Sequence, residues 1–493
     1  MKPHHILLFI LVVIISLIGL SIFFPKEGID IEMRRLYFIS MDEILHSDNT
    51  QPQGLERLLA IEEELRQQRL QDSTCTDVLS HYAAFFESSP IRIDLPDDDL
   101  DFFNDLFAAM DSSLIRGETV RILHYGDSQM EADRITGHIR QYLQDKFGGN
   151  GPGLLPVVPL PSFSMKQTAS ESIIGYIVDG TFQNKATHNR YGVMGQFGHI
   201  NGAGSISVRA RKEKEVYEGG RKFQKEVYER VRKFQNIQLF VGRDNNFSAQ
   251  MTVNREKTRL KADVANVSPI TVHSWNFDEP VTSFSLSMTG KGELYGIAVD
   301  GAAGVAVDNI PFRGSAGTFF TSLEQSVVKA MFKHLNVRLI LLEFGGNVIP
   351  YASSDKAVTD YSNIMLKQIT YLQTLYPEAK ILVMGVADMS TKIKGRLTTY
   401  PYLEALNEAM KEIALQNGAA FWNMYEAMGG KDSMIEWVNH SPALAVSDYV
   451  HFTLEGCERI ASLFYETLMV YYDYYKFVTD NKGLVCEKTQ SQD

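Results

Sequence analysis

Four short apolar runs constrain the fold of this chain most strongly. They are VRILHY (120–125), VRLILLEF (337–344), KILVMGV (380–386) and AAFWNMY (419–425). Continuous apolar runs of this length are typical of parallel strands that are buried on both faces. Helical patterns lie at 135–147, 357–376 and 402–417, and a last one begins near Thr453. The alternation of strands and helices predicts an α/β domain with a parallel sheet.

The segment 152–298 interrupts this alternation. Its apolar residues alternate with polar ones, as in VTSFSLSM (281–288), which is the period of a half-buried strand. We therefore expect a β-rich insert at 152–298 within an α/β domain that is split into 116–151 and 299–475. A tandem repeat at 214–235 (KEVYEGGRKFQ, then KEVYERVRKFQ) lies inside the insert and is predicted to be a solvated extension.

The N-terminus carries an uncharged apolar segment, Ile6 to Phe24. Its nineteen residues are just long enough to cross a hydrocarbon core as a helix. We expect residues 1–26 to be an uncleaved membrane anchor, because the SIFFP sequence lacks the small residues of a signal-peptide cleavage site. A cleaved signal peptide is the alternative. Residues 27–115 are polar and predicted to form a helical stalk or packing region, and 476–493 a C-terminal tail.

Charge and cysteine content argue against several classes of function. The chain has 60 acidic and 48 basic residues and a formal net charge of −12, with no long basic stretch, so we expect no nucleic-acid partner. Its three cysteines lack metal-ligand spacing, and no histidine and carboxylate cluster has zinc spacing. No glycine-rich phosphate loop follows a strand. The sequence therefore predicts neither a metal nor a cofactor.

Three short motifs follow predicted strands or precede helices. They are Gly126-Asp127-Ser128, Gly345-Gly346-Asn347 and Asp448-Tyr449-Val450-His451. Open α/β sheets bind ligands at the carboxyl ends of their strands, so the first two motifs are expected to meet there. Each motif alone is weak, because a serine after a strand is usually only a helix cap. Their residue types, order and positions together indicate a nucleophile with a histidine base.

The motifs resemble those of the SGNH (GDSL-type) hydrolase family. The matching blocks are HYGDSQMEADR (124–134), YGIAVDGAAGVAVDN (295–309), LLEFGGN (341–347) and DYVH (448–451). In the second of these blocks, we take Gly304 rather than Gly301 as the glycine that matches the family motif. The resemblance implies a flavodoxin-like αβα sandwich, interrupted here by a jelly-roll-like insert, and hydrolysis of an ester bond. The first block is similar to that of bacterial peptidoglycan O-acetylesterases, in which a β-sandwich resembling a carbohydrate-binding module follows it.

The resemblance implies a role for each site residue. Ser128 would be the nucleophile, His451 the base that takes and returns its proton, and Asp448 the group that orients the imidazole. The backbone N–H groups of Ser128 and Gly304 and the side-chain amide of Asn347 would stabilise the oxyanion. The expected catalytic set is therefore these five residues.

The chain departs from the family pattern at two positions, and both are expected to affect the choice of substrate. Gln129 replaces the usual apolar residue after the serine, and Val348 replaces a frequent aspartate after the asparagine. We expect a serine esterase that removes O-acetyl groups from an envelope or extracellular glycan, such as peptidoglycan, and that lies on the periplasmic or extracellular side of a membrane. The alternatives are transfer of an acyl group to a polysaccharide, hydrolysis of a lipid or thioester, and non-catalytic glycan binding.

Overall fold

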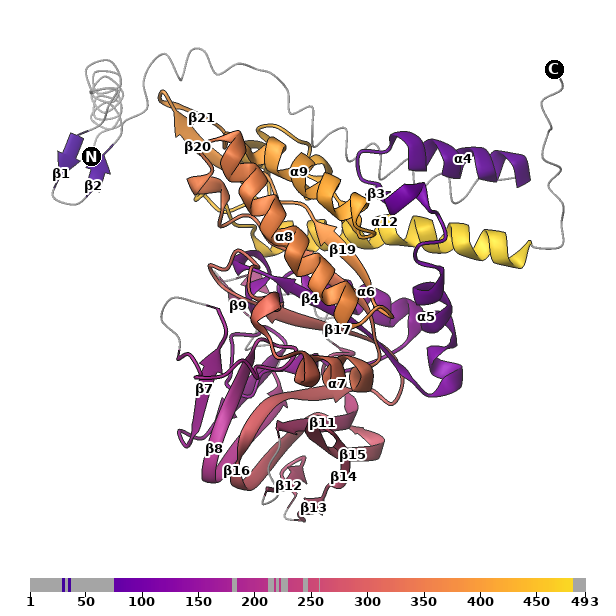
Figure 1. Ribbon diagram of the computed structural model, residues 1–493, viewed down its shortest axis with the longest axis vertical. Coiled ribbons are helices and arrows are strands. Elements are labelled where there is room, and N and C mark those ends of the chain that lie inside the picture. Colours follow the sequence, from indigo (N-terminus) through magenta and orange to yellow (C-terminus); the bar gives the residue numbers. More distant parts are fainter. Residues whose placement is uncertain are drawn as a thin grey trace, which may run out of the picture.

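The structure, a computed structural model, describes residues 29–31, 34–36, 75–179, 184–211, 217–218, 221–222, 229–242, 247–256 and 258–481. Two lobes make up most of this part of the chain (Figure 1). In one, helices cover both faces of a sheet, and the other is built of strands. The lobes correspond to the split α/β domain and its insert.

A six-stranded sheet forms the centre of the α/β domain, in the order β17-β4-β18-β19-β22-β3. Its strands are β17 (Gly304–Pro311), β4 (Thr119–Gly126), β18 (Val337–Glu343), β19 (Lys380–Met384), β22 (Ala420–Trp422) and β3 (Ile93–Asp94). The first five are parallel, and β3 is antiparallel to β22. The predicted apolar runs form β4, β18, β19 and β22, and Leu339 to Leu342 of β18 are fully buried. The prediction of a buried parallel sheet is confirmed.

Helices cover both faces of this sheet, and each face has its own hydrophobic core. One core contains α7 (Gln325–Leu335), α8 (Asp355–Leu375) and α9 (Leu403–Gln416). The other contains α4 (Cys75–Ser88), α5 (Asn104–Arg116), α6 (Thr136–Phe147), α10 (Met424–Ala427), α11 (Ser433–Asn439) and α12 (Leu454–Asp480). The domain is therefore an αβα sandwich.

Residues 75–115 of the expected stalk belong to this domain. β3 extends the central sheet, and Ile91 accepts hydrogen bonds from the Trp422 indole and the Thr467 hydroxyl, each at 3.0 Å. The rings of Phe86 in α4 and of Phe103, just before α5, pack against Tyr471 of α12. The expected boundary at residue 115 therefore differs from the structure, because these contacts join segments that are far apart in the sequence. The amphipathic stretch at 54–71 lies outside the described residues.

The insert is a ten-stranded sheet folded around its own core. Its strands are β5 (Gly153–Leu155), β6 (Met165–Ala169), β7 (Ile173–Ile177), β8 (Gln196–Ala210), β11 (Phe234–Gly242), β12 (Ser248–Val253), β13 (Leu260–Lys261), β14 (Asp263–Val267), β15 (Ile270–Val281) and β16 (Ser283–Asp300). The long β16 pairs with β8 and β5 along one edge and with β12 and β11 along the other. A β-rich insert is therefore present, and its jelly-roll topology stays a prediction.

The tandem repeat is only partly a surface extension. In the first copy, β9 (Tyr217–Glu218) and β10 (Arg221–Lys222) form a short antiparallel hairpin. In the second copy, Val231 and Phe234 are fully buried in the core of the insert. Val231 stands where the first copy has Gly220, so the second copy has an apolar side chain at the position that reaches the core. The prediction that the whole repeat is solvated is therefore wrong for the second copy.

Two further antiparallel pairs are β1 (Ile29–Ile31) with β2 (Arg34–Leu36), and β20 (Ser390–Ile393) with β21 (Arg396–Thr399). The apolar segment from Ile6 to Phe24 lies outside the described residues, and its role as a membrane anchor stays a prediction. Among the residues that are described, the structure contains no helix with the length and apolar character needed to span a membrane.

Candidate active site

The first two motifs lie side by side at the carboxyl edge of the central sheet. Gly126, the last residue of β4, pairs with Glu343, the last residue of β18. The chain leaves both strands at the same edge, as expected for parallel neighbours. The third motif lies in the loop before α12, and residues of all three line a pocket of about 210 Å³. The structure therefore brings the three motifs together.

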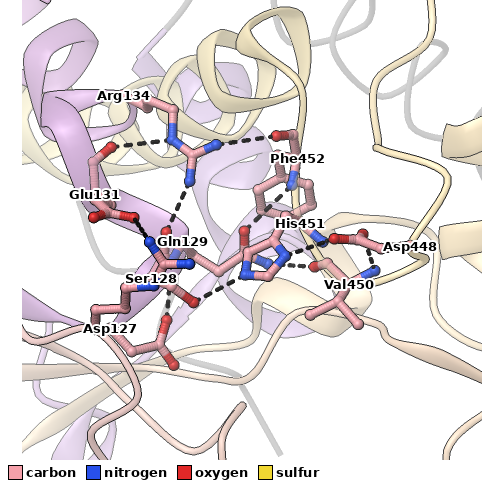
Figure 2. A network of polar contacts seen from close by, with 10 residues as sticks. Asp127, Ser128, Gln129, Glu131, Arg134, Asp448, Val450, His451 and Phe452 are labelled. Atoms are coloured by element: carbon pink, nitrogen blue, oxygen red, sulfur yellow. Dashed lines mark hydrogen bonds and ion pairs between the residues drawn. The ribbon is translucent and has the colours of Figure 1, made fainter. Parts of the chain in front are cut away.

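Three side chains form a hydrogen-bonded chain at this pocket (Figure 2). Ser128 Oγ lies 2.9 Å from His451 Nε2, and His451 Nδ1 lies 2.8 Å from Asp448 Oδ2. The other Asp448 oxygen accepts the backbone N–H groups of Val450 and His451, at 2.9 and 3.0 Å. When Nδ1 carries the hydrogen, Nε2 is free to accept the serine proton. The geometry is that of a nucleophile, a base and a group that orients the base.

The electrostatics of Asp448 suit a group that faces a protonated imidazole. Partial burial alone would raise the pKa of its carboxyl group. The hydrogen bonds from the His451 N–H, the His451 ring and the Val450 N–H outweigh this cost and lower the pKa. The carboxylate is therefore ionised at neutral pH.

Local sequence explains why Ser128 is presented at the end of β4. Asp127 caps the following 3-10 helix, η2 (Ser128–Asp133), because its Oδ1 accepts the Gln129 N–H at 3.0 Å. The capping bond turns the chain immediately after the strand. Glycine at 126 leaves room for the close approach of Met130, since a Cβ there would lie 2.4 Å from the Met130 sulfur and 3.0 Å from the Glu343 carbonyl oxygen.

Asn347 lies next to Ser128 on the pocket lining. Its Nδ2 donates to Asp127 Oδ2 at 2.9 Å and to the Ser315 carbonyl at 3.0 Å. These two bonds use both hydrogens of the amide, so one of them must be exchanged before Asn347 can donate to a substrate. The second departure from the family pattern, Val348, packs against the hydrophobic core and does not line the pocket.

Gly304 lies at the wrong end of the sheet for the role expected of it. It begins β17 and pairs with Thr119, whereas Pro311 pairs with Gly126 at the pocket edge. Seven residues of strand separate the two ends, about 23 Å. The Gly304 N–H instead donates to the Glu118 carbonyl at 3.0 Å. The expectation failed because Gly304 begins a strand, whereas the site needs a glycine that follows one.

The loop after β17 contains two candidate site residues that were not predicted from the sequence. It contains Ser315, whose carbonyl holds Asn347, and Gly314, which has a positive φ of 77°. A Cβ at Gly314 would meet no atom within 4 Å, so the space beside the Gly314 Cα is open. The sequence RGSAG (313–317), shortly after β17, is the signal that could have identified this loop.

A buried polar layer lies beneath Ser128. His124 Nε2 lies 3.0 Å from Glu343 Oε2, and its Nδ1 lies 3.0 Å from the Thr136 hydroxyl. Burial, together with the nearby Glu343 carboxylate, raises the pKa of Asp127 to about 7, even though the Gln129 N–H and Asn347 bonds oppose the shift. Two acidic groups, Asp127 and Glu343, are thus held close together beside Ser128.

Replacing Asp127 with Asn is expected to stabilise the protein more at pH 8 than at pH 4. The pKa of Asp127 rises from 3.8 to about 7 on folding, so the folded state binds more protons between these pH values. Stability therefore falls as pH rises through this window, by about 4 kcal/mol from this group. Urea unfolding of Asp127→Asn and of the wild type at the two pH values measures the difference. Asp263→Asn, at an exposed strand position, is the control, and an equal effect of Asp127→Asn at both pH values would contradict the prediction.

No group of three or more histidine, cysteine or carboxylate side chains among the described residues could hold a metal ion.

The comparison with solved structures identifies the fold. No family model and no curated protein matches the sequence. A solved structure of a peptidoglycan O-acetylesterase matches with a TM-score of 0.54 and 20% identity, over 76% of this chain and 96% of that one. A family two carbohydrate esterase from Cellvibrio japonicus matches with a TM-score of 0.24 and 10% identity, over 63% of this chain and 99% of that one. A carbohydrate acetylesterase from Sinorhizobium meliloti has a TM-score of 0.24 and 14% identity, over 34% and 78%. The first match covers both lobes, and with the parallel sheet and its motifs it shows that the chain has the SGNH/GDSL hydrolase fold.

Proposed function

We infer that this protein is a serine esterase that removes O-acetyl groups from a glycan, with peptidoglycan as the leading candidate. The observation that carries the proposal is the hydrogen-bonded chain Ser128–His451–Asp448 on the wall of a pocket. Of the three solved structures described above, the one with the highest TM-score is a peptidoglycan O-acetylesterase. The likeness supports the substrate class, and the side-chain geometry supports the chemistry.

The reaction follows from the positions of these groups. Ser128 Oγ attacks the acetyl carbonyl while His451 Nε2 takes its proton, and Asp448 stabilises the imidazolium that results. The tetrahedral intermediate collapses, the bond to the sugar oxygen breaks, and His451 returns the proton to that oxygen. Water then attacks the acetyl-serine by the same route and releases acetate.

The oxyanion needs fixed hydrogen-bond donors aimed at the position that the carbonyl oxygen takes in the transition state. We assign the Ser128 N–H, the Gly314 N–H in place of that of Gly304, and the Asn347 amide once it exchanges one of its two present acceptors for the substrate oxygen. Gly314 follows β17, whose last residue Pro311 pairs with Gly126, and the neighbouring Ser315 carbonyl accepts a hydrogen bond from Asn347. The three donors come from the loops after β4, β17 and β18.

The size and lining of the pocket support a short acyl group. Its volume of about 210 Å³ is below the roughly 300–1,000 Å³ of pockets that enclose drug-sized ligands. The walls include apolar side chains of Val386, Ala387, Met389 and Met424. A methyl group fits such walls.

The test is release of acetate from defined O-acetylated glycans. Wild-type protein and Ser128→Ala are incubated with O-acetylated peptidoglycan, acetylated xylan and an aryl acetate, and free acetate is measured. We expect the wild type to release acetate and Ser128→Ala to release none above background. Equal release by both would refute the role of Ser128, and acetyl transfer to an added sugar acceptor without free acetate would favour a transferase.

We also propose that the apolar segment from Ile6 to Phe24 anchors the protein in a membrane, with the esterase domain on the periplasmic or extracellular side. The support is the uncharged sequence of this segment. The full chain is expected in the membrane fraction after carbonate extraction, and the chain without residues 1–26 in the supernatant. Recovery of both in the supernatant would contradict the anchor.

A further inference from the structure

Gln129, which departs from the family pattern, contacts the loop that carries the base. We call residues 446–452 the histidine loop. The Gln129 Nε2 donates to the Val450 carbonyl at 2.6 Å, and its Oε1 accepts the Phe452 N–H at 3.3 Å (Figure 2). One side-chain amide therefore binds the backbone on both sides of His451. Because Gln129 directly follows Ser128, the two neighbours contact three consecutive residues of the histidine loop.

Arg134 joins the same two segments at a second place. Its Nη2 donates to the Ser128 carbonyl at 2.8 Å, and its Nη1 donates to the Phe452 carbonyl at 3.4 Å. Its Nε donates to the Glu131 carbonyl at 3.0 Å, which fixes the guanidinium within η2 (Figure 2). A rigid planar group with several donors can hold two carbonyls at a set separation, which a lysine cannot do.

The histidine loop is partly exposed around the His451–Asp448 pair, whereas Phe452 at its end is buried against Trp437. The side chains of Asp448 and His451 are 46% and 34% exposed. Within the loop, the Val446 N–H donates to the His451 carbonyl at 2.8 Å, and outside it the Ser390 N–H donates to the Tyr449 carbonyl at 3.0 Å. Gln129 and Arg134 join the loop to η2. Without them, a displacement of the loop relative to η2 would change the 2.9 Å distance between Ser128 Oγ and His451 Nε2, while the His451–Asp448 pair lies within the loop and would be kept.

We propose that Gln129 and Arg134 are positioning residues that set the geometry of Ser128 and His451 by joining η2 to the histidine loop. The proposal rests on the esterase function proposed above. Gln129 was expected to affect the choice of substrate. The proposal instead gives it the role of holding His451 in position. A misplacement of about 1 Å between reacting groups can cost about 100-fold in rate, which sets the scale of the expected effect.

The test compares two Gln→Leu variants that each lose a bond from a glutamine amide to a backbone carbonyl. Gln129→Leu removes the contacts with the histidine loop, and Gln373→Leu removes the bond of 2.7 Å to the Asn417 carbonyl, on α8. With an aryl acetate, Gln129→Leu should lower kcat between tenfold and 100-fold and change KM less than threefold. Gln373→Leu should leave both within twofold. Arg134→Lys should lower kcat at least fivefold, and it serves as the test if Gln129→Leu does not fold.

Hydrogen exchange supplies a readout that does not depend on activity. In Gln129→Leu the Phe452 amide should exchange at least tenfold faster than in the wild type, and in Gln373→Leu at the wild-type rate. The proposal is overturned if Gln129→Leu keeps kcat within twofold of the wild type, or if Phe452 exchange is unchanged. A wild-type protein that neither hydrolyses esters nor reacts with a fluorophosphonate would refute the esterase function. If the Phe452 amide still exchanged faster in Gln129→Leu, the structural contact between Gln129 and the histidine loop would nevertheless be confirmed.

Discussion

Replacing Asp448 with Asn is expected to lower kcat about 10⁴-fold, the scale of loss for the orienting carboxylate of a serine hydrolase. The amide oxygen can still accept the Val450 and His451 N–H groups, so the loop geometry is retained. The position that faces His451 Nδ1 loses its negative charge, and the imidazolium formed during attack loses its stabilising partner. Steady-state kinetics with an aryl acetate measure the loss.

The matched control is Asp360→Asn on the exposed face of α8, where an ion pair with Lys356 at 2.6 Å is lost instead. This variant should keep the wild-type kcat, because a surface ion pair contributes at most about 1 kcal/mol to stability and lies away from the pocket. A loss of less than tenfold in Asp448→Asn would show that Asp448 does not support His451.

Replacing Arg121 with Leu is expected to lower the free energy of unfolding by about 3–5 kcal/mol at pH 7, the cost of leaving a buried charge unpaired. Arg121 of β4 is buried, with its guanidinium 2.7 Å from Asp308 of β17 and in contact with Asp300 at the end of β16. The Leu154 N–H of β5 also donates to Asp308, at 2.8 Å. The cluster thus joins the α/β domain to the first and last strands of the insert.

Urea unfolding measures this loss, with Arg116→Leu, at an exposed position of α5, as the control. Adding Asp300→Asn and Asp308→Asn to Arg121→Leu should restore much of the lost stability, because the unpaired carboxylates are then removed. Destabilisation below about 1 kcal/mol in Arg121→Leu, on the scale of a surface ion pair, would show that the cluster does not hold the lobes together.

The sequence predicted the parts of the site that follow buried strands. Apolar runs such as 337–344 are local signals of a parallel sheet, and a parallel sheet places the ends of neighbouring strands together. Ser128 and Asn347 follow such strands, so their closeness could be inferred without coordinates. His451 and Asp448 were found through the DYVH pattern and the helix expected after it.

Features that depend on contacts between distant segments were missed. Gly304 was taken as a glycine that follows a strand, but the structure has β16 ending at Asp300 and β17 beginning at Gly304, so this glycine starts a strand. The pairing of β3 with β22 joins residues more than 300 positions apart, so the stalk region gave no local sign of its place in the sheet. The contacts of Gln129 are equally remote in sequence, which is why its side chain was assigned to substrate choice.

The most direct measurement of the central claim is covalent labelling by a fluorophosphonate, followed by mass spectrometry of the modified peptide. An activated serine attacks the phosphorus and displaces fluoride, whereas an unactivated serine does not react at a useful rate. The account predicts a single adduct on Ser128 in the wild type, a much slower adduct in Asp448→Asn, and none in Ser128→Ala. An adduct on another serine, or no adduct in a folded wild-type protein, would contradict it.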